Sequence, residues 1–262
     1  MGAFHNFRTL VIAICATSAL LCASCATGAK EEAENNTPEN RSRLLARMGT
    51  EAMLRGDYPQ AIEDLRKAIV SDDKNAGAHN NLGLAYWQMG QKNQAAKEMG
   101  RALELNPTDA DAHINLGTIA IEQNNLSVAR HHYQSAIDNL EYKMRHRALT
   151  NMAQLDLREN NIDGARQLLY QSIQANPEYC MSHYLLGTIF MKDGNGRAAV
   201  DEYKKSLRNT CVNNVEAHYQ LALAYVKVKQ YDKARSEFAL LIDQYPQTMQ
   251  GQHAGEQLKN IP

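Results

Sequence analysis

The sequence predicts an all-α protein, a right-handed superhelical solenoid built from six helical hairpins. Small residues recur in phase, 34 to 36 residues apart, at Gly49, Gly83, Gly117, Ala153, Gly187 and Ala222. A second series is alanine every time and falls at Ala61, Ala95, Ala129, Ala165, Ala199 and Ala234. One small residue in each helix lets the two helices of a hairpin cross closely. Because a single hairpin cannot bury its apolar face alone, the copies should stack into an array.

The second copy, residues 76–109, carries the fullest pattern. Its matching positions are Leu82, Gly83, Tyr86, Ala95, Met99, Ala102 and Pro107. These residues resemble the tetratricopeptide repeat (TPR), in which two helices occupy 34 residues and a proline closes the unit. Large residues beside the small ones fill the space that remains between the helices. The resemblance implies a TPR array along most of the chain.

The phase of the two series divides the chain into segments. We expect a signal peptide at 1–24, a lipidated polar tether at 25–41 and a capping segment at 249–262. The six repeats are expected at 42–75, 76–109, 110–145, 146–179, 180–214 and 215–248. The third repeat is two residues longer than the second and lacks the closing proline near residues 141–145. A looser joint is therefore predicted before the fourth repeat.

Composition narrows the classes of partner. The chain of 262 residues has a net charge of −1 and a pI near 6.8. Phosphate binding needs a basic face, so nucleic acid is not expected as a main partner. An array of this kind is expected to act as a monomer, with proteins as its partners.

The N-terminus predicts export and a lipid anchor. Arg8 precedes an uncharged run at residues 9–24, which has the length of a signal-peptide core. Ala23 and Ser24 stand just before Cys25, and this order resembles the lipobox of bacterial lipoproteins, in which the cysteine is lipidated. Cys22 stands where that motif usually has leucine, so an ordinary cleaved signal is the alternative. Ala26 in place of aspartate implies sorting to the outer membrane, facing the periplasm, and the polar stretch that follows should be a disordered tether.

Two cysteines lie far from this anchor. Cys180 should open the first helix of the fifth hairpin, and Cys211 should follow the end of its second helix. Antiparallel helices bring these ends to one edge, within reach of a disulfide. An oxidising compartment would preserve such a bond, whereas two free thiols are the alternative.

Motifs of catalysis are missing from the sequence. It contains no nucleophile elbow, zinc helix motif, phosphate loop or dinucleotide fingerprint, so we expect neither an enzyme nor a cofactor. His79, His113, His183 and His218 share one repeat position. Neighbouring repeats would hold them about 10 Å apart, too far to share one metal, so we interpret them as packing residues.

A partner-binding groove is expected on the first helices of repeats two to four. Asn81, Asn115 and Asn151 recur two places before the small residue, where carboxamides could bind the backbone of an extended peptide. Apolar contacts are expected from Leu84, Trp87, Ile114 and Ile121. Packing or bridging between neighbouring helices is the alternative for all seven.

Lipobox, tether and six repeats together resemble the outer-membrane lipoproteins of type IV pilus systems, the PilF, PilW and Tgl group. The Cys180 and Cys211 pair is most similar to the Tgl branch. The resemblance implies a pilotin, which binds secretin subunits and promotes their assembly in the outer membrane. A general periplasmic adaptor for other envelope machinery is the alternative function.

Overall fold

The computed structural model describes residues 37–262, and every regular element among them is a helix. The predicted signal peptide, Cys25 and the predicted tether up to residue 36 lie outside the described residues. The described residues divide into two compact units, 37–107 (unit 1) and 108–262 (unit 2). No helix within 37–262 is long and apolar enough to cross a membrane.

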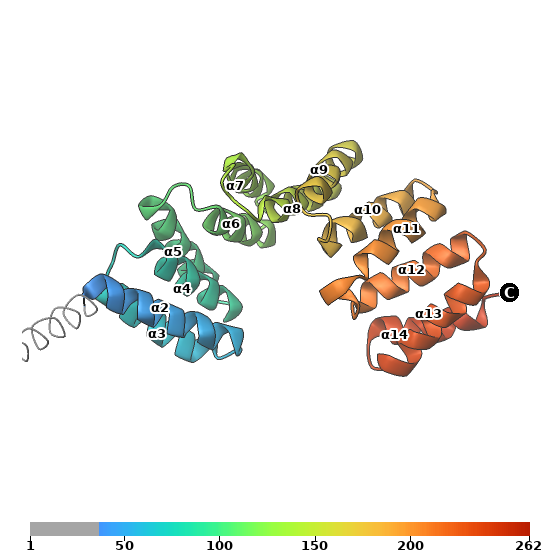
Figure 1. The fold of residues 1–262 in the computed structure, drawn as a ribbon, viewed down its shortest axis with the longest axis horizontal. Helices are drawn as coiled ribbons and strands as arrows, with labels where there is room; N and C mark the ends of the chain where they lie inside the picture. Colours follow the sequence, from blue (N-terminus) through green and yellow to red (C-terminus); the bar gives the residue numbers. More distant parts are fainter. Residues whose placement is uncertain (1–36) are drawn as a thin grey trace, which may run out of the picture. The chain divides into compact units, whose positions relative to one another are not determined.

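Unit 1 contains two helical hairpins that stack side by side (Figure 1). They are formed by α2 (Pro38–Leu54) with α3 (Tyr58–Ser71), and by α4 (Ala76–Gln88) with α5 (Lys92–Leu105). The helix α2 begins four residues before the expected first repeat, because Thr37 accepts a hydrogen bond from the backbone N–H of Asn40 and Pro38 occupies the first turn. The prediction that residues 38–41 belong to a disordered tether was therefore wrong.

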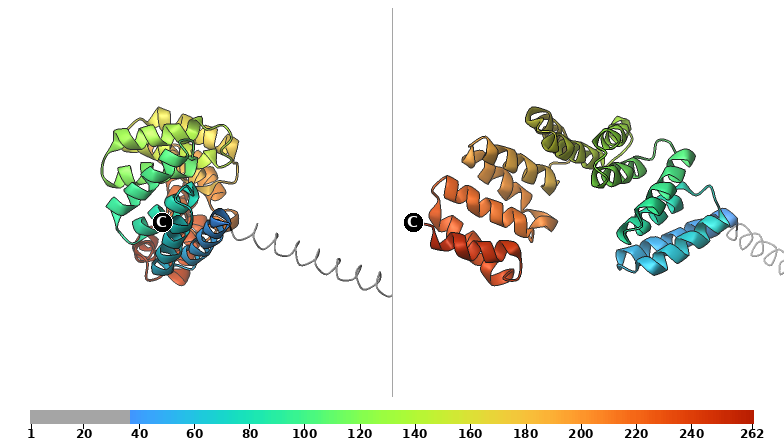
Figure 2. Two further views of the ribbon diagram at one scale, coloured as in Figure 1. Left: turned by 90° about the vertical axis from the view of Figure 1, so that its left-hand side faces the viewer. Right: turned by 180° about the vertical axis from the view of Figure 1, so that it is seen from behind.

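Unit 2 contains four hairpins and a final helix, again packed in chain order (Figures 1 and 2). The first two hairpins are α6 (Ala110–Glu122) with α7 (Leu126–Asp138), and α8 (Arg145–Arg158) with α9 (Ile162–Ala175). The next two are α10 (Cys180–Lys192) with α11 (Gly196–Ser206), and α12 (Val215–Lys227) with α13 (Tyr231–Gln244). A 3₁₀ turn, η1 (Asn209–Cys211), follows α11, and α14 (Met249–Lys259) covers the end of unit 2, where its Ala254 joins the apolar core.

Side-chain caps explain where many of the helices begin, although α5, α8, α10 and α13 have none. The side chains of Asp57, Asn75, Asp109, Asn125, Asn161, Asn195 and Asn214 each accept a hydrogen bond from a backbone N–H three residues later. Inside each hairpin, one residue at a fixed place has positive φ. It is glycine at Gly56, Gly90 and Gly194, and asparagine or lysine at Asn124, Asn160 and Lys229.

The small residues occupy the crossing points, as predicted. A Cβ atom added to Gly83 would lie 2.6 Å from Met99 Cγ and 2.9 Å from the backbone oxygen of Ala95. All six alanines of the second series are fully buried. The prediction of close helix crossings in all six hairpins is therefore confirmed, and the chain is an all-α solenoid.

Candidate functional site

A hollow of unit 1 lies on the α2–α3 hairpin. Its volume is about 700 Å³, and it is lined by Arg41, Leu45, Pro59, Ile62, Glu63, Arg66, Lys67, Val70 and Ser71. Leu45, Pro59, Ile62 and Val70 give it an apolar floor, and the Val70 side chain is 88% exposed. We call this hollow the first-hairpin groove. The first-hairpin groove is therefore a candidate surface for binding a partner.

Basic side chains form the rim of the first-hairpin groove. Arg66 is held in place because its Nε donates to the Tyr86 hydroxyl at 2.9 Å. Lys67 Nζ donates to Glu63 at 2.6 Å, and this hydrogen bond raises the pKa of the Lys67 ammonium. Basic groups outnumber acidic ones on the rim, so it favours a segment with an apolar face and acidic flanks.

Sequence reasoning missed this groove, although the sequence held a signal. Val70 lies nine residues after the buried alanine of its repeat. The other five repeats have polar residues there: Glu104, Asp138, Gln174, Arg208 and Asp243. An apolar residue at a position that is otherwise polar marks the first repeat as different.

The expected groove residues of unit 1 lie on α4. Asn81 donates from its carboxamide to the Thr50 hydroxyl of α2 at 3.0 Å. This bond joins two neighbouring first helices, which is the bridging role that we kept as the alternative. Leu84 and Trp87 are partly buried on the same helix.

The expected groove residues of unit 2 separate into two environments. Ile121 and Asn151 line one pocket of about 310 Å³, together with Thr118, Tyr133, Gln154, Leu155 and Arg158. Ile114, by contrast, is only 3% exposed and packs in the core with Tyr133 and Met152. Its prediction as a groove residue was wrong, because the residue three places before Gly117 faces the helix crossing. Asn115 is partly buried on α6.

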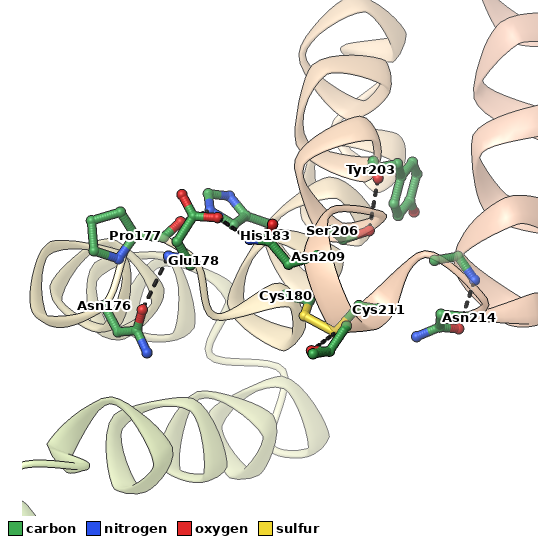
Figure 3. The surroundings of a disulfide bond; sticks show 12 residues. Asn176, Pro177, Glu178, Cys180, His183, Tyr203, Ser206, Asn209, Cys211 and Asn214 are labelled. Carbon is green, nitrogen blue, oxygen red and sulfur yellow. Dashed lines mark hydrogen bonds between the residues drawn. A yellow bond between two sulfur atoms is a disulfide. The ribbon is translucent and has the colours of Figure 1, made fainter.

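A disulfide joins Cys180, the first residue of α10, to Cys211 at the end of η1 (Figure 3). The two Cα atoms are 6.5 Å apart. The η1 turn also bonds to the preceding connection, because Asn209 donates to Glu178. The disulfide therefore closes the edge of the fifth hairpin at which α10 begins and α11 ends.

The recurrent histidines are buried and hydrogen bonded within their own hairpins. The Nδ1 atom of His79 lies 2.7 Å from Oε2 of Glu98. The same atom of His183 lies 2.6 Å from Oε2 of Glu202, and that of His218 lies 2.7 Å from Oε2 of Glu237. In each case Nε2 lies close to a backbone oxygen six residues earlier. Within residues 37–262, no group of three or more metal-ligating side chains is gathered. The acidic partner was missed, although glutamate recurs 19 residues after each of these histidines.

Hairpin three departs from this arrangement. His113 Nδ1 lies 3.0 Å from Nδ1 of His132, which takes the place of the glutamate. Burial, and then the charges of His113 and His131, lower the pKa of His132 to about 4. In hairpin six, the hydrogen bond to Glu237 raises the pKa of His218.

Comparison with known proteins supports the repeat assignment. The family described as TPR repeat matches residues 49–90, and the family described as tetratricopeptide repeat matches residues 82–143 and 184–247. Together these matches span more than half of the chain. No curated protein matches the sequence.

Solved structures share the fold. The PilF structure from Pseudomonas aeruginosa has a TM-score of 0.74 and 20% identity, covering 84% of this chain and 99% of that one. PilW, whose structure is described as that of a widely conserved type IV pilus biogenesis factor, has a TM-score of 0.72 and 20% identity, covering 81% and 97%. The Cut9–Hcn1 structure of the APC/C also has a TM-score of 0.72, at 17% identity, but the match covers only 44% of that chain. From its six hairpins, their buried crossing residues and these matches, we conclude that the chain belongs to the tetratricopeptide repeat family.

Proposed function

We propose that this protein is an outer-membrane lipoprotein that binds secretin subunits and promotes their multimerisation for type IV pilus biogenesis. The matches to PilF and PilW support this proposal, because they cover nearly all of those two chains and more than four fifths of this one. The large APC/C structure matches over less than half of its own length. The protein would act by binding alone, as repeat arrays commonly do.

The anchor would be a lipid on Cys25, with the repeats facing the periplasm. The lipobox order Ala23, Ser24, Cys25 supports this part of the proposal. Two or more acyl chains hold a protein stably at a bilayer, whereas one chain binds reversibly. Secretin subunits arriving at the outer membrane would thus meet a protein that is already there.

The first-hairpin groove carries the binding part of the proposal. Its apolar floor and basic rim suit an amphipathic segment of the secretin subunit, with apolar residues toward Ile62 and Val70 and acidic residues toward Arg66 and Lys67. Burying an apolar anchor in such a hollow supplies most of the affinity in many interfaces. The rim charges would orient the segment and accelerate its association.

The test is Val70→Glu, a change that places an acidic group in the groove floor. Glutamate and aspartate already stand at this position in the second and third repeats, so folding should be preserved. We expect several-fold fewer heat-resistant secretin multimers and an unchanged melting temperature. The matched control is Leu54→Glu, because Leu54 is 84% exposed but lies outside the groove lining.

Two results would contradict the proposal. Normal amounts of secretin multimers in a strain that lacks the protein would refute the proposed function, and would favour a general periplasmic adaptor. Equal losses of secretin multimers in Val70→Glu and Leu54→Glu would show that the first-hairpin groove is not the binding site. Reduced multimers for Val70→Glu alone would support both parts.

A further inference from the structure

A second pocket lies within unit 2, between the first helices of repeats three and four. Thr118 and Ile121 come from α6, Tyr133 from α7, and Asn151, Gln154, Leu155 and Arg158 from α8. The four residues of α8 have helical spacing, so they share one face. The volume of about 310 Å³ fits one or two side chains of a partner better than a whole helix.

The corresponding place in unit 1 is closed by a hydrogen bond. Asn81 and Thr50 have the same repeat positions as Asn151 and Thr118, and there the carboxamide donates directly to the hydroxyl at 3.0 Å. Both threonine hydroxyls donate to the backbone oxygen four residues earlier, Thr50 to Ala46 at 2.8 Å and Thr118 to Ile114 at 2.9 Å. In unit 2 the Thr118 hydroxyl also lies 3.3 Å from that of Tyr133, and no hydrogen bond joins Thr118 to Asn151.

The connection between α7 and α8 also differs from its counterpart in unit 1. Six residues link these helices, whereas four link α3 to α4. The connection is ordered by contacts of its own, since Tyr142 donates to Asp111 at 2.6 Å and Arg145 donates to the backbone oxygen of Ile137 at 2.8 Å. The two inserted residues, expected to loosen this joint, thus lie in an ordered connection that leads into α8, the helix that carries Asn151.

The polar groups of the pocket are available to a ligand. Among residues 37–262, no hydrogen bond or ion pair engages the side chains of Asn151, Gln154 or Arg158. The nearby acidic residues Asp156 and Glu159 are bound by Arg130 instead. The positive charge of Arg158 thus stands beside two free carboxamides and the apolar Ile121 and Leu155.

We infer that this pocket binds a partner segment through an aspartate or glutamate side chain that lies next to an apolar residue. Arg158 would pair with the carboxylate, Asn151 and Gln154 would donate to it or to the adjoining backbone, and Ile121 would contact the apolar neighbour. Tyr133 remains a neutral hydroxyl, because burial raises its pKa. The inference rests on the proposed function only in that the chain acts by binding protein segments.

The test uses the full chain and a library of randomised decapeptides with blocked ends, so that only side chains can supply carboxylates. Peptides enriched on the protein should carry Asp or Glu within two residues of Leu, Ile, Phe or Met. For one such peptide, Arg158→Gln in the protein and Glu→Gln in the peptide should each weaken binding about tenfold or more. Together they should weaken it little further, since both remove the same ion pair.

The matched control is Arg197→Gln, which removes an exposed arginine of unit 2 on α11. We expect its affinity to stay within twofold of the wild type and all melting temperatures to agree. No enrichment, enrichment without acidic residues, or equal losses at Arg158 and Arg197 would overturn the inference. Loss of binding in Val70→Glu but not in Arg158→Gln would also overturn it, by placing the peptides in the first-hairpin groove. None of these results depends on secretin, so the proposed function is tested separately.

Discussion

At the scale of single residues, glycine has opposite effects at two sites in one hairpin. Gly83 is where α4 crosses α5, and its added Cβ would meet Met99 and Ala95. A Cβ atom added to Gly100, within α5, would have no neighbouring atom within 4 Å. The first glycine is required by packing, whereas the second only weakens its helix.

Gly83→Ala should therefore destabilise the protein by about 1–3 kcal/mol, because the helices must move apart. Gly100→Ala is the control, and should raise stability by up to about 1 kcal/mol through helix propensity. Urea unfolding monitored by circular dichroism measures both. Equal changes of the same sign would mean that the close crossing at Gly83 is not what holds the hairpin together.

The sequence specified crossing residues better than surface residues. Glycine and alanine at a fixed spacing have few reasons to recur other than close helix packing. The two series of crossing residues could therefore be identified from the sequence. The partner of Asn81 and the burial of Ile114 could not be predicted from the sequence. Both depend on which side of a first helix packs against the neighbouring helix. Repeat position alone does not distinguish that side from the open one.

At the scale of the hairpin, the histidine pairs respond to pH in opposite directions. A raised pKa at His218 stabilises the fold below the unfolded value of about 6.5, and this contribution is lost as pH rises through the folded pKa. The lowered pKa of His132 stabilises the fold above about 6.5, and this contribution is lost as pH falls toward 4. The third hairpin is thus the acid-sensitive one of the two.

His132→Glu gives the third hairpin the pair that three others have. We expect the wild type to lose about 1 kcal/mol relative to this variant between pH 7 and pH 5, after allowance for solvent screening. His253→Glu is the control, since His253 is exposed on α14 and is not among the groups that shift the pKa of His132. The measurement is the free energy of unfolding of each protein at pH 7 and pH 5. An equal change in this free energy for the wild type and His132→Glu would contradict the expectation.

At the scale of the whole chain, the number and order of hairpins follow from repeat phase, but the binding surfaces do not. The first-hairpin groove includes Val70, an apolar residue where the other repeats are polar, and the unit 2 pocket is lined by α8, which follows the connection with two extra residues. A search for recurring features overlooks both, because each is a place where the recurrence fails.

The disulfide gives the last prediction, since in an array each repeat is stabilised mainly by its neighbours. The Cys180–Cys211 bond closes a loop with a sequence separation of 31 residues, worth about 3–4 kcal/mol in the chain-entropy model. Replacing both cysteines with serine should therefore lower the melting temperature and speed hydrogen exchange in α10 to α14, while α2 to α5 exchange as before. Adding reductant to the wild type should reproduce the effect, and adding it to the double variant should change nothing. Uniformly faster exchange along all helices would show instead that the six hairpins unfold as one cooperative body.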